Sequence, residues 1–177
     1  MNSPVFSGSN DLRCNTGGAT GGKTATYTVA AGATVGFKMD QTIFHAGPIL
    51  VYISKAPSTA ATYDGSGQWA KIYQIAPQIS SSGINWNDVT DTFNFKLPSS
   101  LAAGEYLLRI EHIALHSMPA QFYVSCAQLK VTGGGSAVPT GILLPGGYPA
   151  NHPGINLNIY YPVLTSYTMP GPAVWSG

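Results

Sequence analysis

The sequence predicts an all-β protein, and the expected architecture is an antiparallel β-sandwich with long loops. Three observations predict this class: short segments in which apolar and polar residues alternate, turn signals between those segments, and few stretches with helical periodicity. The chain has 177 residues, of which 44% are hydrophobic, and one hydrophobic core can accommodate that length. We therefore expect residues 1–177 to form a single β-sandwich domain.

The first two candidate strands show the alternation most clearly. In residues 23–29 apolar side chains alternate with threonines, which places Ala25, Tyr27 and Val29 on one face. The alternation resumes over residues 35–39. Both segments are typical of strands whose two faces meet different environments.

A continuous apolar run follows over residues 49–53 and ends before Pro57, which favours a strand buried on both faces. Three further candidate strands are residues 93–97, 106–110 and 122–131. The turn signals that separate the strands are residues 64–67, 80–83 and 103–104. Short strands at this spacing are typical of a sandwich.

The last part of the chain, from residue 133 onward, differs from the rest. Glycine and proline recur in it, yet it also carries leucine, isoleucine and four tyrosines. A flexible linker would not contain so much apolar side chain. We expect a long ordered loop that packs against the sandwich.

Charge is scarce: only 8% of the residues are charged, and eight Lys and Arg against seven Asp and Glu leave a net charge of +1. These few charges cannot form the basic face that a nucleic acid requires. No apolar run approaches the length of about 18 residues that a membrane span needs. The 21 glycines, 13 prolines and 10 tyrosines instead indicate a loop-rich secreted protein. Residues 1–4 show no signal peptide, which suggests an altered N-terminus.

The two cysteines, Cys14 and Cys126, leave two interpretations open. In an oxidising compartment they would pair and close a loop of about 110 residues, worth roughly 4–5 kcal/mol in the chain-entropy model. Alternatively they are two unrelated buried thiols. Their spacing excludes a Cys-x-x-Cys redox or zinc site.

Four histidines offer candidate chemistry: His45, His112, His116 and His152. On a helix, His112 and His116 would share one face and could form a zinc pair, whereas on a strand they would lie ~13 Å apart and could not share an ion. Gln121 and Tyr123 would point to the same face of a strand, where a nearby histidine could complete a polar site. No nucleophile elbow, phosphate loop, dinucleotide motif or carboxylate pair is present.

Several ordered motifs resemble those of one enzyme family. The segments are residues 10–15 (NDLRCN), 45–48 (HAGP), 104–116 (GEYLLRIEHIALH), 120–126 (AQFYVSC), 131–135 (VTGGG), 153–156 (PGIN), 158–160 (NIY) and 170–172 (PGP). Together they resemble the fungal lytic polysaccharide monooxygenases of auxiliary activity family nine, over about residues 2–177. The resemblance implies an immunoglobulin-like or fibronectin-like sandwich.

The resemblance also implies a copper site, in which one ion per chain is held by a histidine brace. His45 corresponds to the second brace histidine and Tyr123 to the axial ligand, while His116 and Gln121 correspond to outer-shell groups that hydrogen-bond oxygen species. Copper favours such nitrogen donors, and a weak axial oxygen tunes it. The first brace histidine of the family is N-terminal, and here position 1 is Met1, so the chain is expected to lack it and the start of the family domain.

The remaining implications concern the substrate and the surroundings. Tyr160, and with it Tyr161, correspond to aromatic residues of a flat cellulose-binding face, and Cys14 and Cys126 to a family disulfide. The implied reaction is oxidation of a β-1,4-glucan at C1 or C4, with dioxygen or hydrogen peroxide as cosubstrate and an external electron donor. We expect a secreted monomer without nucleic-acid or membrane partners.

Two other functions compete with this hypothesis. A non-catalytic carbohydrate-binding sandwich would keep the aromatic face without the brace, as an altered N-terminus favours. A zinc hydrolase would use His112 and His116. Copper titration and a search for oxidised products discriminate between the monooxygenase and the binding protein. Retention of zinc through dialysis tests the zinc hydrolase.

Overall fold

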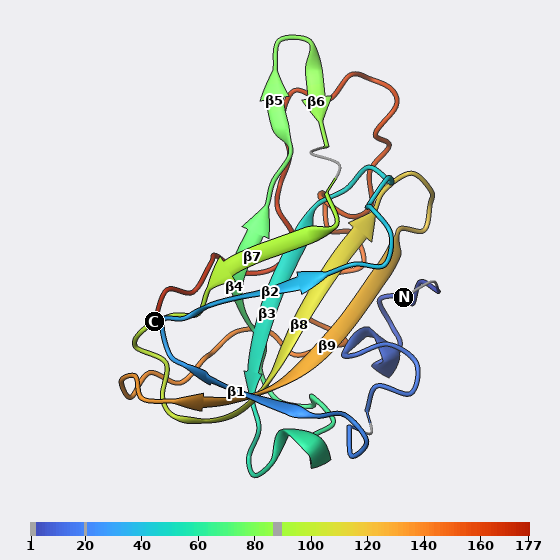
Figure 1. The fold of residues 1–177 in the computed structure, drawn as a ribbon. Helices are drawn as coiled ribbons and strands as arrows, with labels where there is room; N and C mark the ends of the chain where they lie inside the picture. The colour runs from blue at the N-terminus through green and yellow to red at the C-terminus, as the bar shows by residue number, and fades with distance from the viewer. Residues whose placement is uncertain (1–2, 20, 87–89) are drawn as a thin grey trace.

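The computed structural model describes residues 3–19, 21–86 and 90–177, and it confirms the all-β prediction (Figure 1). Met1 and Asn2, to which the expectations about the N-terminus refer, lie outside the described residues. The elements are η1 (Asn10–Leu12), β1 (Thr26–Ala30), β2 (Thr34–Lys38), β3 (Ile49–Lys55), η2 (Ala60–Thr62), β4 (Ala70–Ile75), β5 (Gln78–Ser80), β6 (Gly83–Asn85), β7 (Thr92–Lys96), β8 (Gly104–Ala114) and β9 (Gln121–Thr132). In this part of the chain no helix is long and apolar enough to cross a membrane.

The main sheet has five strands in the order β1-β9-β8-β3-β4. Its pairs are antiparallel except β1 with β9, which run parallel, a departure from the purely antiparallel prediction. Strand β3 is buried on both faces, as its apolar run predicts. Strands β8 and β9 extend beyond their predicted ranges, while β4, β5 and β6 have no counterpart among the predicted strands. Tyr27 of β1 is 69% exposed because β1 is an edge strand of this sheet.

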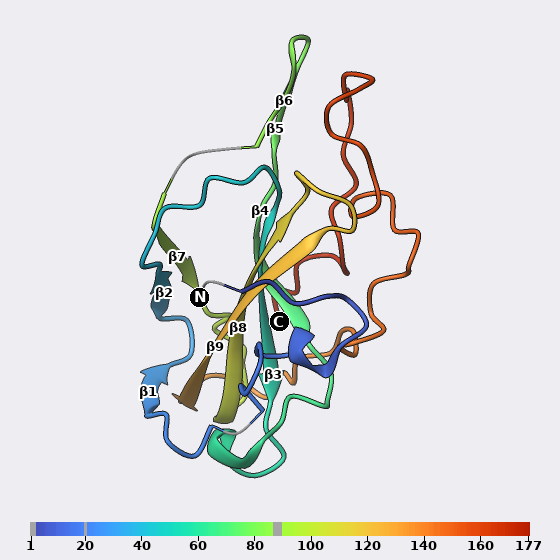
Figure 2. The ribbon, with the colours of Figure 1, turned by 90° about the vertical axis from the view of Figure 1, so that its right-hand side faces the viewer.

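A second layer, the antiparallel pair β2–β7, covers one face of the main sheet (Figure 2). Phe93 and Phe95 of β7 enter the core between the layers, as their alternation predicts. On β8 the even-numbered residues Tyr106, Leu108 and Ile110 join the same core. The side chains of β8 alternate between the two sides of the main sheet, both of which are covered, and this explains why nearly the whole strand is buried.

Irregular segments cover the opposite face of the main sheet. Leu12 from the N-terminal segment and Leu144 and Tyr148 from the last part of the chain join Leu107 and Ile113 of β8 in a second core. The last part is tied down as well as packed: the Nζ of Lys71 donates to the carbonyl of Pro170 at 2.8 Å. The prediction of an ordered loop packed on the sandwich is confirmed.

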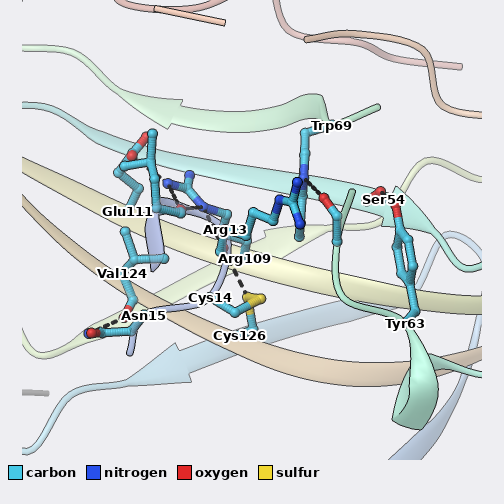
Figure 3. Close-up of a disulfide and its surroundings, with 12 residues drawn as sticks. Arg13, Cys14, Asn15, Ser54, Tyr63, Trp69, Arg109, Glu111, Val124 and Cys126 are labelled. Atoms are coloured by element: carbon cyan, nitrogen blue, oxygen red, sulfur yellow. Dashed lines mark hydrogen bonds and ion pairs between the residues drawn. A yellow bond between two sulfur atoms is a disulfide. The ribbon is translucent and has the colours of Figure 1, made fainter. Parts of the chain in front are cut away.

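The disulfide between Cys14 and Cys126 fastens the N-terminal segment to β9, with Cα atoms 5.3 Å apart (Figure 3). This finding resolves the two interpretations of the cysteines in favour of the bridge. Nearby, the Nε of Arg109 donates to the carbonyl of Arg13 at 2.9 Å, and the Nδ2 of Asn15 donates to the carbonyl of Val124 at 3.2 Å. The segment is therefore held to the sheet covalently and by hydrogen bonds.

Several connections gather at one end of the molecule. Figure 1 shows the β2–β3 and β8–β9 connections at the upper end of the sheet, with the β5–β6 hairpin and a loop of the last part of the chain extending beyond them. Gly83 of the hairpin lies close to Val163 of that loop. All the histidines and tyrosines singled out for the copper site lie in or beside these connections.

Candidate active site

His45 begins a four-residue turn, residues 45–48, that leads into β3. Two hydrogen bonds fasten the turn to the end of β8: the amide of Leu115 donates to the carbonyl of Ala46 at 2.8 Å, and the amide of Ile113 donates to the carbonyl of Pro48 at 3.1 Å. Gly47 is required between them, because its φ is +152° and a Cβ there would overlap the carbonyl of Ile113. The turn therefore has a defined position relative to β8.

His116 follows the end of β8, and its ring stacks on that of His45. The two ring centroids are 3.7 Å apart and the ring planes differ by 5°. Partial burial, and secondarily the charge that His116 would carry, lower the pKa of His45. The Nδ1 of His116 is buried and has no hydrogen-bond partner among the described residues. Two imidazole rings thus lie face to face, and one of their nitrogens, the Nδ1 of His116, makes no hydrogen bond with the described residues.

Gln121 and Tyr123 begin β9 and point to the same face, as their spacing predicts. The hydroxyl of Tyr123 donates to Oε1 of Gln121 at 2.9 Å, and the Tyr123 ring centroid lies 6.2 Å from that of His45. The structure therefore brings together all four residues for which the resemblance implies a role near the metal.

The position of His112 decides between the helix and the strand that the sequence left open for this segment. Residues 104–114 form a strand, which excludes the helical zinc pair of His112 with His116 and leaves the strand alternative, and His116, beyond the strand, stacks on His45. His112 instead lies opposite Tyr123 in the β8–β9 register, with ring centroids 6.2 Å apart. The signal was available, because a hairpin symmetric about its short connection pairs these two positions.

The burial of His112 sets its protonation. Its side chain is 6% exposed, and desolvation lowers its pKa to about 4, so the ring is neutral near pH 7. Its Nδ1 lies 3.3 Å from the carbonyl oxygen of Pro48, and its Nε2 is buried with no partner in the described part of the chain.

A cavity of about 340 Å³ adjoins these rings. Its lining residues are Asp40, Gln41, Thr42, Ile43, Phe44, His45, His112 and Tyr123. Phe44, which is 73% exposed and whose ring centroid is 4.3 Å from that of His45, is a lining residue that sequence reasoning missed. Across residues 3–19, 21–86 and 90–177, no group of three or more His, Cys, Asp and Glu side chains is arranged to hold a metal ion. The donor groups among the lining residues include the imidazoles of His45 and His112 and the phenol of Tyr123.

Tyr160 and Tyr161 lie beside the histidine pair on the last part of the chain. They are 69% and 79% exposed, and the hydroxyl of Tyr160 donates to the backbone carbonyl of His116 at 3.1 Å. No Asp, Glu, Lys or Arg occurs after Lys130. The surface around Tyr160 that this part of the chain provides is thus aromatic and polar but uncharged.

Comparison with known proteins agrees with this arrangement. A sequence profile of Auxiliary Activity family 9 (formerly GH61) matches residues 1–167. AA9 family lytic polysaccharide monooxygenase C of Emericella nidulans is 49% identical over 175 residues, which are 94% of this chain and 76% of that relative. AA9 family lytic polysaccharide monooxygenase E of Podospora anserina is 49% identical over 180 residues, which are 99% of this chain but only 60% of that relative.

Solved structures give the same result. HiLPMO9B is similar with a TM-score of 0.90 at 36% identity, over 100% of this chain and 85% of that one. A cellulose-active polysaccharide monooxygenase from M. thermophila is similar with a TM-score of 0.87 at 34% identity, again over 100% and 85%. The resemblance of the motifs is confirmed, and the chain belongs to Auxiliary Activity family 9, the copper-dependent lytic polysaccharide monooxygenases.

Proposed function

We propose that this chain cleaves cellulose, a β-1,4-linked glucan, by copper-dependent oxidation at C1, at C4 or at both. The observation that carries the proposal is the stack of His45 on His116 next to the Tyr123–Gln121 pair. These side chains place imidazole nitrogens and a phenol oxygen at one end of the molecule, beside exposed tyrosines. The family to which the chain belongs acts on polysaccharides by oxidation.

The donors at this end suit copper by their chemistry. Imidazole nitrogen is a donor that Cu(II) favours, and a phenol oxygen would be a second, weaker donor. His45 and Tyr123 would hold the ion, and the lowered pKa of His45 favours the neutral ring that binds metals. His112 and His116 each add one ring nitrogen that has no partner within the part of the chain that the structure describes. When bound, copper supplies the redox chemistry that these side chains lack.

His116 and Gln121 would orient the oxygen cosubstrate, dioxygen or hydrogen peroxide. Gln121 uses its Oε1 to accept from Tyr123, which leaves its amide N–H groups to donate. The ring of His116 carries an unpartnered Nδ1 and is fixed by its stack on His45. Both groups can therefore donate or hold a proton near the metal without holding the metal themselves.

Tyr160 and Tyr161 would bind the glucan. Exposed tyrosine rings can stack on the apolar faces of pyranose rings, and the surrounding chain carries no charge that a neutral polysaccharide would have to desolvate. The similar protein from M. thermophila is described as cellulose-active, which supports cellulose as the substrate. An external reductant would supply the electrons. The enzymes of this family are secreted fungal proteins, and we propose that this chain too acts as a secreted monomer.

A second candidate function is a carbohydrate-binding protein without catalysis. The observation that favours it is that the described residues provide no cluster of three or more metal-binding His, Cys, Asp or Glu side chains. The exposed tyrosines would then act alone.

Calorimetric titration with Cu(II), followed by incubation with cellulose and ascorbate, tests both functions. The proposed enzyme binds copper tightly and releases oligosaccharides whose mass and chromatography show oxidation at C1 or C4. A copper dissociation constant above micromolar, together with an absence of oxidised products, would instead support the non-catalytic carbohydrate-binding protein. Tyr160→Ala and Tyr161→Ala should each weaken adsorption to cellulose, whereas Tyr27→Ala, which removes an equally exposed tyrosine on β1, should not.

A further inference from the structure

His112 contacts both parts of the chain that supply the proposed copper donors. On one side, its Nδ1 lies 3.3 Å from the carbonyl oxygen of Pro48, the last residue of the turn that begins with His45. The same oxygen accepts the amide of Ile113 at 3.1 Å. One carbonyl thus joins the turn to β8 through a backbone and a side-chain hydrogen bond.

On its other side, His112 faces Tyr123. The two residues are directly opposite in the antiparallel β8–β9 register, and their ring centroids are 6.2 Å apart with ring planes 27° from parallel. The Tyr123 ring lies at the same centroid distance from His45. The ring of Tyr123 therefore lies at the same centroid distance, 6.2 Å, from both histidine rings.

The hydrogen bond to Pro48 also assigns the tautomer of His112. A carbonyl oxygen only accepts, so Nδ1 must carry the hydrogen and Nε2 must carry the lone pair. Nε2 is buried without a partner in the described structure, and His112 lines the same cavity as His45 and Tyr123. A buried unsatisfied nitrogen lowers stability relative to an apolar side chain of similar size. Packing alone therefore does not explain a histidine at this position.

We propose that His112 is a positioning residue of the copper site, which fixes the turn carrying His45 through Pro48 and fixes the ring of Tyr123 by contact. The inference rests on the proposed copper function and adds a residue that neither the brace nor the outer-shell pair includes. Its role resembles that of other groups that orient metal ligands, whose loss costs about 10- to 100-fold in metal affinity or activity.

The test compares His112→Leu, which removes the donor to Pro48, with His112→Asn, whose amide N–H can still reach that carbonyl. Phe122→Leu is the matched control, because it shortens a buried ring on the opposite face of β9. Each protein is titrated with one equivalent of Cu(II), and affinity and the electron paramagnetic resonance spectrum are recorded. His112→Leu should lose about tenfold or more in affinity and change the copper hyperfine splitting. His112→Asn should recover most of the affinity, and Phe122→Leu should lower only the melting temperature.

Metal-free protein gives a second readout. In carbon-13 NMR spectra, His112→Leu should shift the ring signals of His45 and Tyr123, whereas Phe122→Leu should leave the His45 signals in place. If His112→Leu keeps the affinity, the spectrum and both ring signals, His112 has no positioning role although the copper function stands. If the unsubstituted protein binds no copper, the proposed function and this inference fail together.

Discussion

Strands β8 and β9 carry two groups of polar side chains in opposite states. In the middle of β8, Arg109 and Glu111 are fully buried and form an ion pair, and Tyr148 donates to Glu111. Only the Nη1 of Arg109 lacks a partner in that group within the described structure. At the end of β8, His112 and His116 each keep one buried ring nitrogen that has no partner among the described residues.

The difference between these groups indicates what each of them does. Polar groups that are buried and paired hold segments together, and here Arg109 also donates to the carbonyl of Leu12 and so fastens the N-terminal segment. Buried nitrogens without a partner call for another explanation, and His112 lines the cavity beside His45. We therefore expect substitutions in the buried group to change stability and substitutions in the histidine group to change metal binding or the oxygen chemistry.

Glu111→Leu is one of the two changes that we expect to affect stability most. This change leaves the buried charge of Arg109 without compensation, and breaking such a pair costs about 3–5 kcal/mol of the free energy of unfolding. Urea unfolding measures it. The double variant Arg109→Met/Glu111→Leu should recover much of the loss, since no charge then remains buried. If Glu111→Leu lowers the free energy of unfolding by less than about 1 kcal/mol, the buried ion pair is not what distinguishes this group from the histidine group.

Cys126→Ser is the other change that we expect to lower stability strongly. The bridge spans 112 residues of sequence, and opening it costs roughly 4–5 kcal/mol at most in the chain-entropy model. The melting temperature should fall by several degrees. Mass spectrometry of the secreted, unsubstituted protein should show no free thiol, and two free thiols would contradict the role given to the bridge.

Lys71 extends the buried polar group, and its pKa predicts a pH dependence. Burial lowers the pKa of its ammonium to about 8, against a favourable contribution from the charge of Glu111. The unfolded chain therefore binds more protons than the folded chain above pH 8, so the free energy of unfolding should rise between pH 8 and 9.5, by roughly 1–2 kcal/mol. Lys71→Met should abolish this rise. An equal rise in both proteins would assign it to another group.

The smallest effect on stability is expected at the histidine end. His45→Ala should change the free energy of unfolding by about 1 kcal/mol or less, because the ring is only partly buried, yet it should abolish the Cu(II) resonance spectrum of the native site. Tyr123→Phe should alter the spectrum only mildly. His116→Ala should leave copper uptake nearly intact and impair the oxygen chemistry. The reverse order, with His45→Ala silent, would overturn the assignment of the metal donors.

Much of the fold follows from local sequence. The alternation in β7 and the apolar run of β3 correctly predict strands, because which side chains meet the core depends on neighbours in the same strand. The proximity of Gln121 to Tyr123 follows from the same periodicity. Strand β4 escaped prediction because its buried Lys71 interrupts the apolar pattern, and the partner that makes this burial possible, Pro170, is far away in the chain.

The sequence by itself determined the class of fold and the family, and it supplied the residues proposed for the copper site, since these depend on periodicity and on motifs within single segments. Only the tertiary structure decided which polar groups are paired. Arg109 meets Leu12 across 97 positions, His45 meets His116 through two different connections, and His112 meets Tyr123 through strand register. Such partnerships depend on how distant segments pack, and the free energy of a buried polar group depends on its partner rather than on its neighbours in sequence.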